Sequence, residues 1–199
     1  MTKPNFIFKA TSVLVLCLLS SAISFAQTDT RTVQVEPSYE VVLQVVVGSN
    51  VTAQKTNLPA NLAVVTKNLR NNFTFSNYSL SDTYIGRVAN TGSIEYKTLS
   101  NNFGQAQNSQ TPSFLDWTLG SLRSAPNGKG QNAIQIQPFR FGARVPVITG
   151  GGVVNYESIG LNMHRISLPE NAPTLIGTLP TLKTGETIFL VLTVRPVEE

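Results

Sequence analysis

The first strongly hydrophobic segment beyond residue 30 runs from Tyr39 to Val47. It is rich in valine and almost continuously apolar, and Gly48-Ser49-Asn50 follows it. β-branched residues favour strands, and an apolar run without clear alternation is typical of a strand covered on both faces. We therefore expect a buried strand over 39–47.

The next segment has a helical period. Five hydrophobic residues recur at spacings of four, three, four and four, which places them on one helical face. These residues are Leu58, Leu62, Val65, Leu69 and Phe73. Pro59 suits the first turn, where its missing N–H costs nothing. The pattern predicts one amphipathic helix over about 59–71.

Three short strands are expected after this helix, over 73–80, 83–89 and 93–99. Asn90-Thr91-Gly92 connects the last two, and a short connection that contains glycine is typical of a hairpin. Together with the preceding strand and helix, these segments predict a βαββ unit over 38–100, in which the helix covers one face of a small sheet.

The remainder of the chain is expected to be a polar linker or long loop (101–113) and a β-rich, sandwich-like region (114–199). Pro138 interrupts the alternation of its segment, which favours an edge strand or a bulge. This region forms either one domain with 38–100 or a second packed subdomain. The predicted fold class is α+β, predominantly antiparallel β with one amphipathic helix. The strand segments expected beyond 113 are 114–122, 134–141, 159–163, 174–179 and 187–194.

The N-terminus has the pattern of a secretory signal. Lys3 and Lys9 precede an apolar run over 13–19, and Ser24-Phe25-Ala26 then supplies small residues three and one before a cleavage site. A retained membrane anchor is the alternative, but the run is shorter than the ~20 residues that span a bilayer.

We therefore expect a signal peptide over 1–26, cleaved between Ala26 and Gln27, and a flexible leader over 27–37. The only cysteine, Cys17, lies in the signal, so the mature chain is expected to have neither a disulfide nor a thiolate. The expected location is periplasmic or extracellular, with no stable membrane span after cleavage.

The charge pattern argues against nucleic-acid binding. Without Lys3 and Lys9 the chain keeps 13 basic residues against 11 acidic ones, a net charge of +2. The basic residues are scattered, whereas nucleic-acid-binding proteins usually cluster them on one face. We expect no nucleic-acid partner, whereas a protein of the cell envelope is a candidate partner. The oligomeric state is open.

Side chains suited to catalysis are sparse. His164 is the only histidine, whereas a histidine base needs a nucleophile beside it and a zinc site commonly needs several His or Cys ligands. No pair of carboxylates stands out for glycosidase chemistry. We therefore predict no catalytic residue, no cofactor and no metal site, and a protein that is not an enzyme. The main carboxylates of the body are Glu95, Asp116, Glu157, Glu170 and Glu186.

Aromatic residues supply the only candidate ligand-binding set. Trp117 and Tyr156, with Tyr84 and Tyr78 as further members, are candidates for a platform on which sugars stack. Aromatic side chains flanked by alternating apolar residues are more often core residues, which is the favoured interpretation.

Two segments resemble parts of bacterial secretins. Residues 58–80 (LPANLAVVTKNLRNNFTFSNYSL), which follow the strand YEVVLQVVV, look like the βαββ periplasmic modules of that family. Residues 179–194 (LPTLKTGETIFLVLTV) are similar to a glycine-Glu/Gln-Thr turn and apolar strand in the secretin core. The chain has no room for the stacked domains and barrel of a whole secretin. The resemblance implies a small accessory or stand-alone envelope protein that docks by edge-strand pairing. The chain also looks like short exported bacterial proteins of unassigned role.

Three functions follow as hypotheses. The first is an exported, non-enzymatic envelope protein that binds another envelope or secretion component through β-sheet surfaces. The second is a small-ligand or carbohydrate-binding β module that uses Trp117 and Tyr156. The third is a hydrolase with an unrecognised site.

Overall fold

The computed structural model describes residues 36–50, 58–100, 111–150, 152–181 and 185–197. They belong to one compact unit, Glu36–Glu199. The predicted signal peptide, its cleavage site and most of the predicted leader lie outside the described residues. Of the predicted linker over 101–113, only the last three residues are described, and Ser113 is already part of a strand.

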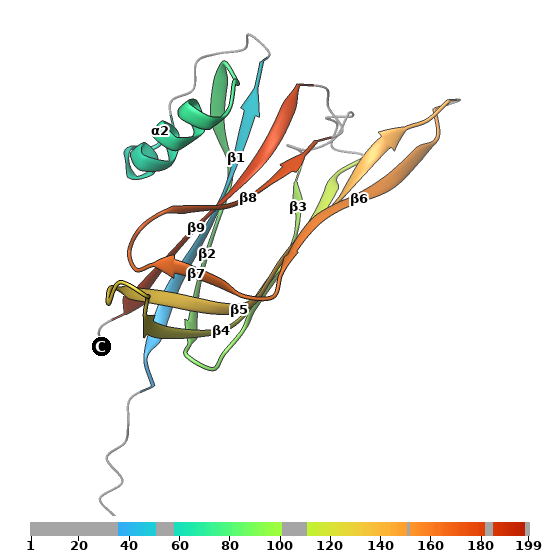
Figure 1. The fold of residues 1–199 in the computed structure, drawn as a ribbon. Coiled ribbons are helices and arrows are strands. Elements are labelled where there is room, and N and C mark those ends of the chain that lie inside the picture. Colours follow the sequence, from blue (N-terminus) through green and yellow to red (C-terminus); the bar gives the residue numbers. More distant parts are fainter. Residues whose placement is uncertain (1–35, 51–57, 101–110, 151, 182–184, 198–199) are drawn as a thin grey trace, which may run out of the picture. The chain divides into compact units, whose positions relative to one another are not determined.

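Two antiparallel sheets make up the unit (Figure 1). Sheet A has the order β2-β1-β9-β8, and sheet B has the order β3-β4-β5-β6, with the short strand β7 also paired to β5. The strands of sheet A are β1 (Ser38–Ser49), β2 (Asn77–Ala89), β8 (Thr174–Pro180) and β9 (Glu186–Val197). Those of sheet B are β3 (Ile94–Ser100), β4 (Ser113–Pro126), β5 (Asn132–Ile148), β6 (Val154–Met163) and β7 (Ile166–Pro169).

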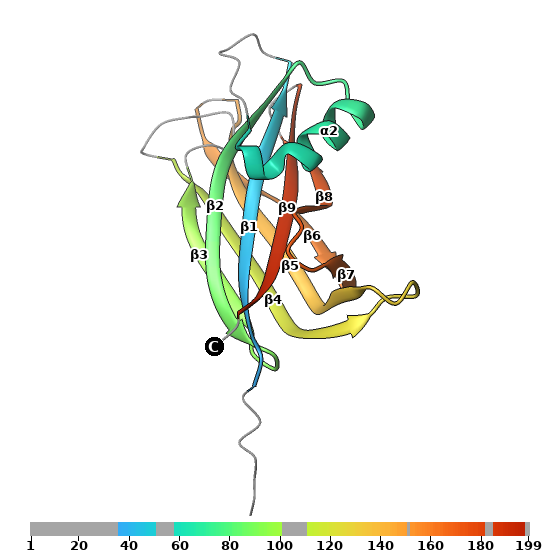
Figure 2. The ribbon, with the colours of Figure 1, turned by 90° about the vertical axis from the view of Figure 1, so that its left-hand side faces the viewer.

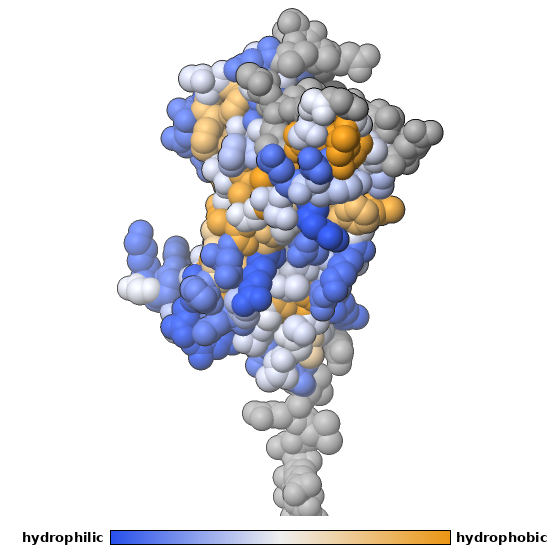
Figure 3. Space-filling view, turned by 90° about the vertical axis from the view of Figure 1, so that its right-hand side faces the viewer, coloured by the Kyte–Doolittle hydropathy of each residue, from blue (hydrophilic) through white to orange (hydrophobic). Residues whose placement is uncertain are grey.

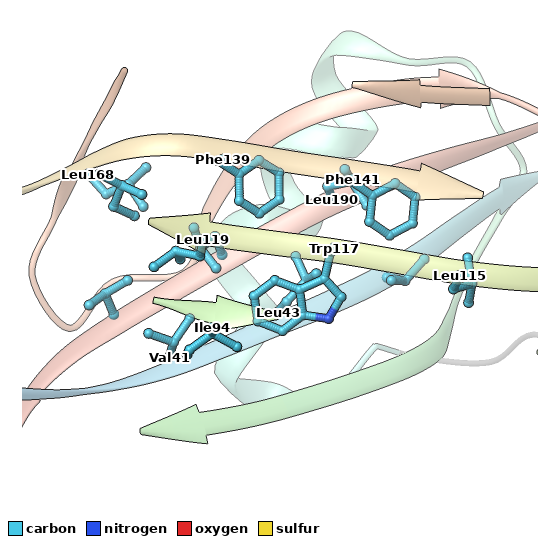
Figure 4. Packing of buried hydrophobic residues seen from close by; sticks show 14 of the residues in the cluster. Val41, Leu43, Ile94, Leu115, Trp117, Leu119, Phe139, Phe141, Leu168 and Leu190 are labelled. Atoms are coloured by element: carbon cyan, nitrogen blue, oxygen red, sulfur yellow. The ribbon is translucent and has the colours of Figure 1, made fainter. Parts of the chain in front are cut away.

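The main hydrophobic core lies between the two sheets. Alternate residues of β1, such as Val41 and Leu43, face this core together with Leu190 of β9. Trp117 and Phe139 meet them from sheet B (Figure 4). Because side chains alternate across a strand, the other face of sheet A remains apolar as well and needs a second cover.

One helix supplies that cover. A 3₁₀ turn, η2 (Ala60–Leu62), leads into α2 (Ala63–Asn72), which lies across the outer face of sheet A (Figure 2). A second cluster packs there, and the Tyr78 hydroxyl donates to the Leu69 and Phe73 carbonyls at 3.0 and 3.2 Å. The cluster's buried members are Val46, Leu62, Val65, Leu69, Tyr78, Phe189 and Val191.

These elements confirm the predicted α+β class, mostly antiparallel β with a single helix among the described residues. The buried strand over 39–47 and the helix over 59–71 are confirmed within two residues at each end. The last strand of the βαββ sequence, β3, lies in sheet B rather than beside β1 and β2. Residues 38–100 and 114–199 therefore share one core.

The two strands predicted over 73–80 and 83–89 are one strand, β2. Its register against β1 shifts so that Val45 faces Asp82 and Val46 faces Leu80, which leaves Ser81 as an extra residue. Such a bulge reverses the alternation of side chains. Tyr84 and Val88 therefore pack in the main core, whereas Tyr78 and Leu80 contact the helix-side cluster.

Of the two alternatives for Pro138, an edge strand or a bulge, the edge is wrong, because β5 is a central strand. The pairing of β4 with β5 is interrupted at Pro138 without a change of register. Proline is disfavoured in central strands because it has no N–H to donate to a neighbouring strand. At Pro138, however, the strand that pairs with β5 changes from β7 to β6. β7 pairs with β5 over Ala133–Ile136, and β6 pairs with it over Phe139–Ile148. The N–H that Pro138 lacks therefore falls between the β5–β7 and β5–β6 hydrogen-bond ladders.

No helix within the described part of the chain is both long and apolar enough to cross a membrane.

Candidate functional site

The two predicted ligand-binding aromatics lie on opposite faces of sheet B. Trp117 of β4 is 1% exposed and belongs to the core between the sheets, whereas Tyr156 of β6 is 43% exposed. The structure does not bring them together. Their ligand-binding role stays a prediction, and of the two only Tyr156 is open to solvent.

Trp117 is part of an aromatic cluster that joins the two sheets. Its ring stacks on Tyr96 of β3 at 5.2 Å with an interplanar angle of 3°, and Tyr84 of β2 lies 6.2 Å away. The Tyr96 hydroxyl donates to the Ile85 carbonyl at 2.7 Å, which ties β3 to β2. Burial raises the pKa of Tyr84 to about 12. These contacts give the cluster a structural role at the seam of the sandwich.

Solvent-exposed hydrophobic side chains gather on the outer face of sheet B. Leu99 of β3, Phe114 of β4 and Arg144 of β5 are register neighbours across three strands. Ile148 and Val154 form a further exposed pair where β5 meets β6. We call this surface the sheet-B patch; its residues are Leu99, Phe114, Arg144, Ile148, Val154 and Tyr156.

Phe114 is the centre of the patch. The Tyr156 ring lies 5.4 Å from the Phe114 ring at 60°, and the Arg144 guanidinium carbon lies 5.0 Å from the ring centroid. The Tyr156 hydroxyl donates to the Pro112 carbonyl at 3.3 Å. An arginine above an aromatic ring within about 6 Å is a favourable cation–π arrangement. The three side chains are therefore held in place by one another before any ligand arrives.

A shallow depression of about 490 Å³ lies beside this aromatic centre. Leu99, Phe114 and Arg144 form part of its wall, and Lys97 and Asp116 supply charge. Gly142 lies opposite Asp116, and a Cβ there would come within 3.0 Å of the carboxylate. The absence of a side chain at Gly142 leaves the Asp116 carboxylate room on this face.

Lys97 already has a partner on its own strand. Its Nζ lies 2.7 Å from Glu95 Oε1, and this hydrogen bond, more than the added attraction of Asp116, raises the pKa of Lys97. Both side chains are well exposed. The ion pair is therefore easily exchanged for contacts with a ligand or a partner.

The space-filling view from the β6 side shows how polarity is distributed (Figure 3). Hydrophobic surface is concentrated in the upper half of this face, and hydrophilic surface dominates the lower half. Scattered apolar residues are normal on protein surfaces, whereas contiguous ones often mark interaction sites.

The residues considered for catalysis are dispersed. His164 is exposed at the bend between β6 and β7, and Glu157 is exposed on β6. Glu170 accepts a hydrogen bond from Ser124 at 2.7 Å, and Glu95 pairs with Lys97. Within the described residues, no three His, Cys, Asp or Glu side chains gather closely enough to hold a metal ion.

Phe114 and Arg144 were not predicted as site residues, yet the sequence carried a signal for Phe114. Leu115, Trp117 and Leu119 alternate as the inward side of β4, so Phe114 at the start of the run has to point outward. An outward phenylalanine is a candidate contact residue. Arg144 has no comparable signal, because its contact depends on the register of β5 against β4.

No protein-family model and no curated protein matches the sequence. Among solved structures, the chain is similar to the type II secretin GspD from enteropathogenic Escherichia coli, at 10% identity over 93% of this chain and 74% of that one, with a TM-score of 0.41. It is also similar to the Salmonella SPI-1 type III secretion injectisome secretin InvG, at 10% identity over 96% and 70% of the two chains, with a TM-score of 0.32. InvG in its open-gate state (residues 176-end) gives 12% identity over 96% and 66%, with a TM-score of 0.31. The resemblance to secretins expected from the sequence is thus present as a distant structural similarity.

Proposed function

We propose that this chain is an exported, non-enzymatic protein of the cell envelope that binds another envelope protein through the sheet-B patch. The observation that carries the proposal is the exposed aromatic centre formed by Phe114, Tyr156 and Arg144. Aromatic residues and arginine are the side chains most enriched where protein interfaces gain their binding energy.

The rigidity of the patch supports this role. Its residues project from paired strands rather than from loops, and Tyr156 and Arg144 already contact Phe114. A side chain that is ordered before binding loses less conformational entropy when a partner arrives. The patch is therefore suited to a folded partner or to an extended segment.

A sheet edge next to the patch supports strand addition. β6 pairs with β5 along one edge, and none of the described strands pairs with its other edge over the segment around Tyr156. When an extended segment adds to such an edge, main-chain hydrogen bonds provide affinity, and contacts with adjacent side chains provide specificity. Tyr156 is the residue that such a segment would meet.

The location is part of the same proposal. The N-terminal charge and hydrophobicity pattern supports cleavage between Ala26 and Gln27 and release into the periplasm or the extracellular space.

A photo-crosslinking amino acid at position 156 tests the proposal in the intact envelope of the source cell. We expect a crosslinked adduct with another envelope protein, absent when the same residue replaces Val64, which is even more exposed than Tyr156 and lies on the far side of sheet A. In the same preparation, intact mass is expected to give a chain that begins at Gln27.

Phe114→Ser is expected to reduce the adduct strongly, and Ile85→Ser, at an exposed position of β2, is the matched control. Recovery of the monomer alone from position 156 would count against partner binding. A full-length chain beginning at Met1 and found among cytosolic proteins would overturn the export proposal.

A carbohydrate is the second candidate ligand for the same face. Two tilted aromatic rings beside Asp116, Arg144 and the 490 Å³ depression combine apolar and hydrogen-bonding surface. Binding on a glycan array that disappears in Tyr156→Ala, with the fold intact, would favour this ligand over a protein.

A further inference from the structure

A second pocket, lined mostly by polar residues, lies away from the sheet-B patch, at the opposite end of β4 and β5. It has a volume of about 280 Å³ and forms where the turn between β2 and β3 meets the edge of β4. The Leu122 N–H donates to the Asn90 carbonyl at 3.0 Å, which fixes that turn against the strand. The walls include Asn90, Thr91, Arg123, Gln135, Gln137 and Arg165.

Two guanidinium groups face this pocket, and neutral side chains hold both. Arg123 Nε and Nη2 donate to Gln135 Oε1 at 3.0 and 2.8 Å. Arg165 Nε and Nη2 donate in the same way to Gln137 Oε1 at 3.3 and 3.1 Å. Gln135 and Gln137 are two residues apart on β5, so the two arginines are positioned from one strand face.

The charge of the two arginines is not neutralised within the described part of the chain. Neither guanidinium has a carboxylate within salt-bridge distance there, and no acidic residue lines the pocket. Two carboxylates near the pocket bind neutral donors rather than the arginines: Glu36 accepts from the Thr91 N–H and hydroxyl, and Glu170 accepts from Ser124. A planar, doubly donating guanidinium that keeps free N–H groups is the preferred partner of an oxyanion.

We propose that this pocket binds the carboxylate of a small organic acid, which lies between Arg123 and Arg165. A volume of about 280 Å³ is at the lower limit of ordinary ligand pockets, which suits a single small molecule. The site is independent of the sheet-B patch, so either proposal can fail without the other.

Titration of the protein with D-glucuronate, followed by backbone amide NMR, tests the site. Saturable shifts are expected for residues around the pocket, namely Thr91, Ser121, Arg123 and Gln135, and not for Phe114 or Tyr156. D-glucose, which has the hydroxyl groups without the carboxylate, is expected to produce no saturable shift at these residues.

The variants Arg123→Gln and Arg165→Gln are each expected to weaken glucuronate binding about tenfold or more, because each removes charged hydrogen bonds. Arg140→Gln changes the net charge equally at an exposed position outside the pocket and is expected to leave binding unchanged. Retention of the amide spectrum shows that a variant is folded. No saturable shift with glucuronate, equal binding of glucose, or equal weakening by Arg140→Gln would overturn the proposal.

Discussion

Gly120 shows how a single missing side chain controls the packing of sheet B. A Cβ at this position would lie 2.4 Å from the Gln137 carbonyl oxygen and 2.7 Å from Pro138 Cδ. The alternation of side chains reverses here in both β4 and β5. Leu119 and its partner Phe139 face the core on one side of this point, and Leu122 and its partner Ile136 face the core on the other side. The close approach of the two backbones is what glycine permits.

Gly120→Ala is expected to lower the free energy of unfolding by about 1–3 kcal/mol, because the clash is with backbone and cannot be relieved by a rotamer change. Gly128→Ala is the control, since no atom lies within 4 Å of a Cβ there. It is expected to be neutral or slightly stabilising. Urea denaturation of both variants gives the comparison, and equal midpoints would contradict the close-packing argument.

At the scale of elements, α2 is held to sheet A by one narrow face. Leu69 is fully buried against residues of β1, β2 and β9, whereas Val64 on the same helix is 66% exposed. A helix of 10 residues has little stability of its own, so its position depends on this contact.

Leu69→Ala is therefore expected to destabilise the protein by about 2–5 kcal/mol through lost burial and a cavity. Val64→Ala, on the solvent side of the helix, is expected to change stability by less than about 0.5 kcal/mol. Thermal or urea unfolding measures both values. A similar loss from the two substitutions would show that the helix is not docked by the face described.

Elements with one uninterrupted pattern were predictable from the sequence. The buried strand at Val41–Val47, the helix around Leu62–Leu69 and the strand at Thr187–Val194 keep a single period throughout and were found close to their true limits. β2 was divided in two because Ser81 forms a bulge, and the bulge reverses the alternation on which the prediction rested. The position of a strand within its sheet was not encoded locally, which is why an edge strand was one of the two alternatives for Pro138.

At the scale of the whole molecule, the decisive pairings join residues that are distant along the chain. β1, near the start of the unit, lies between β2 and the C-terminal strand β9. The apolar alternation around Trp117 is visible in the sequence, but the packing of the two sheets determines that Trp117 is buried and Tyr156 is exposed. The sheet-B patch and the arginine pocket likewise arise from register across strands, which no local pattern specifies.

This interleaving predicts that residues 38–100 do not fold alone. β1 would keep β2 but lose β9, and β3 would lose its only partner in the sheet order, β4. Sheet A would therefore have an open edge at β1, sheet B would be reduced to one unpaired strand, and the core would lose Trp117 and Phe139. A separate fragment of 111–199 would leave β9 without β1. We expect both fragments to give collapsed amide spectra when separate, and the chain from residue 36 onward to give a dispersed spectrum and one cooperative unfolding transition.

Mixing the two fragments is expected to restore part of the dispersed spectrum, because the missing strands then return to their partners. A dispersed spectrum from 38–100 in isolation would instead establish two independent domains, and the account of one shared core would be wrong.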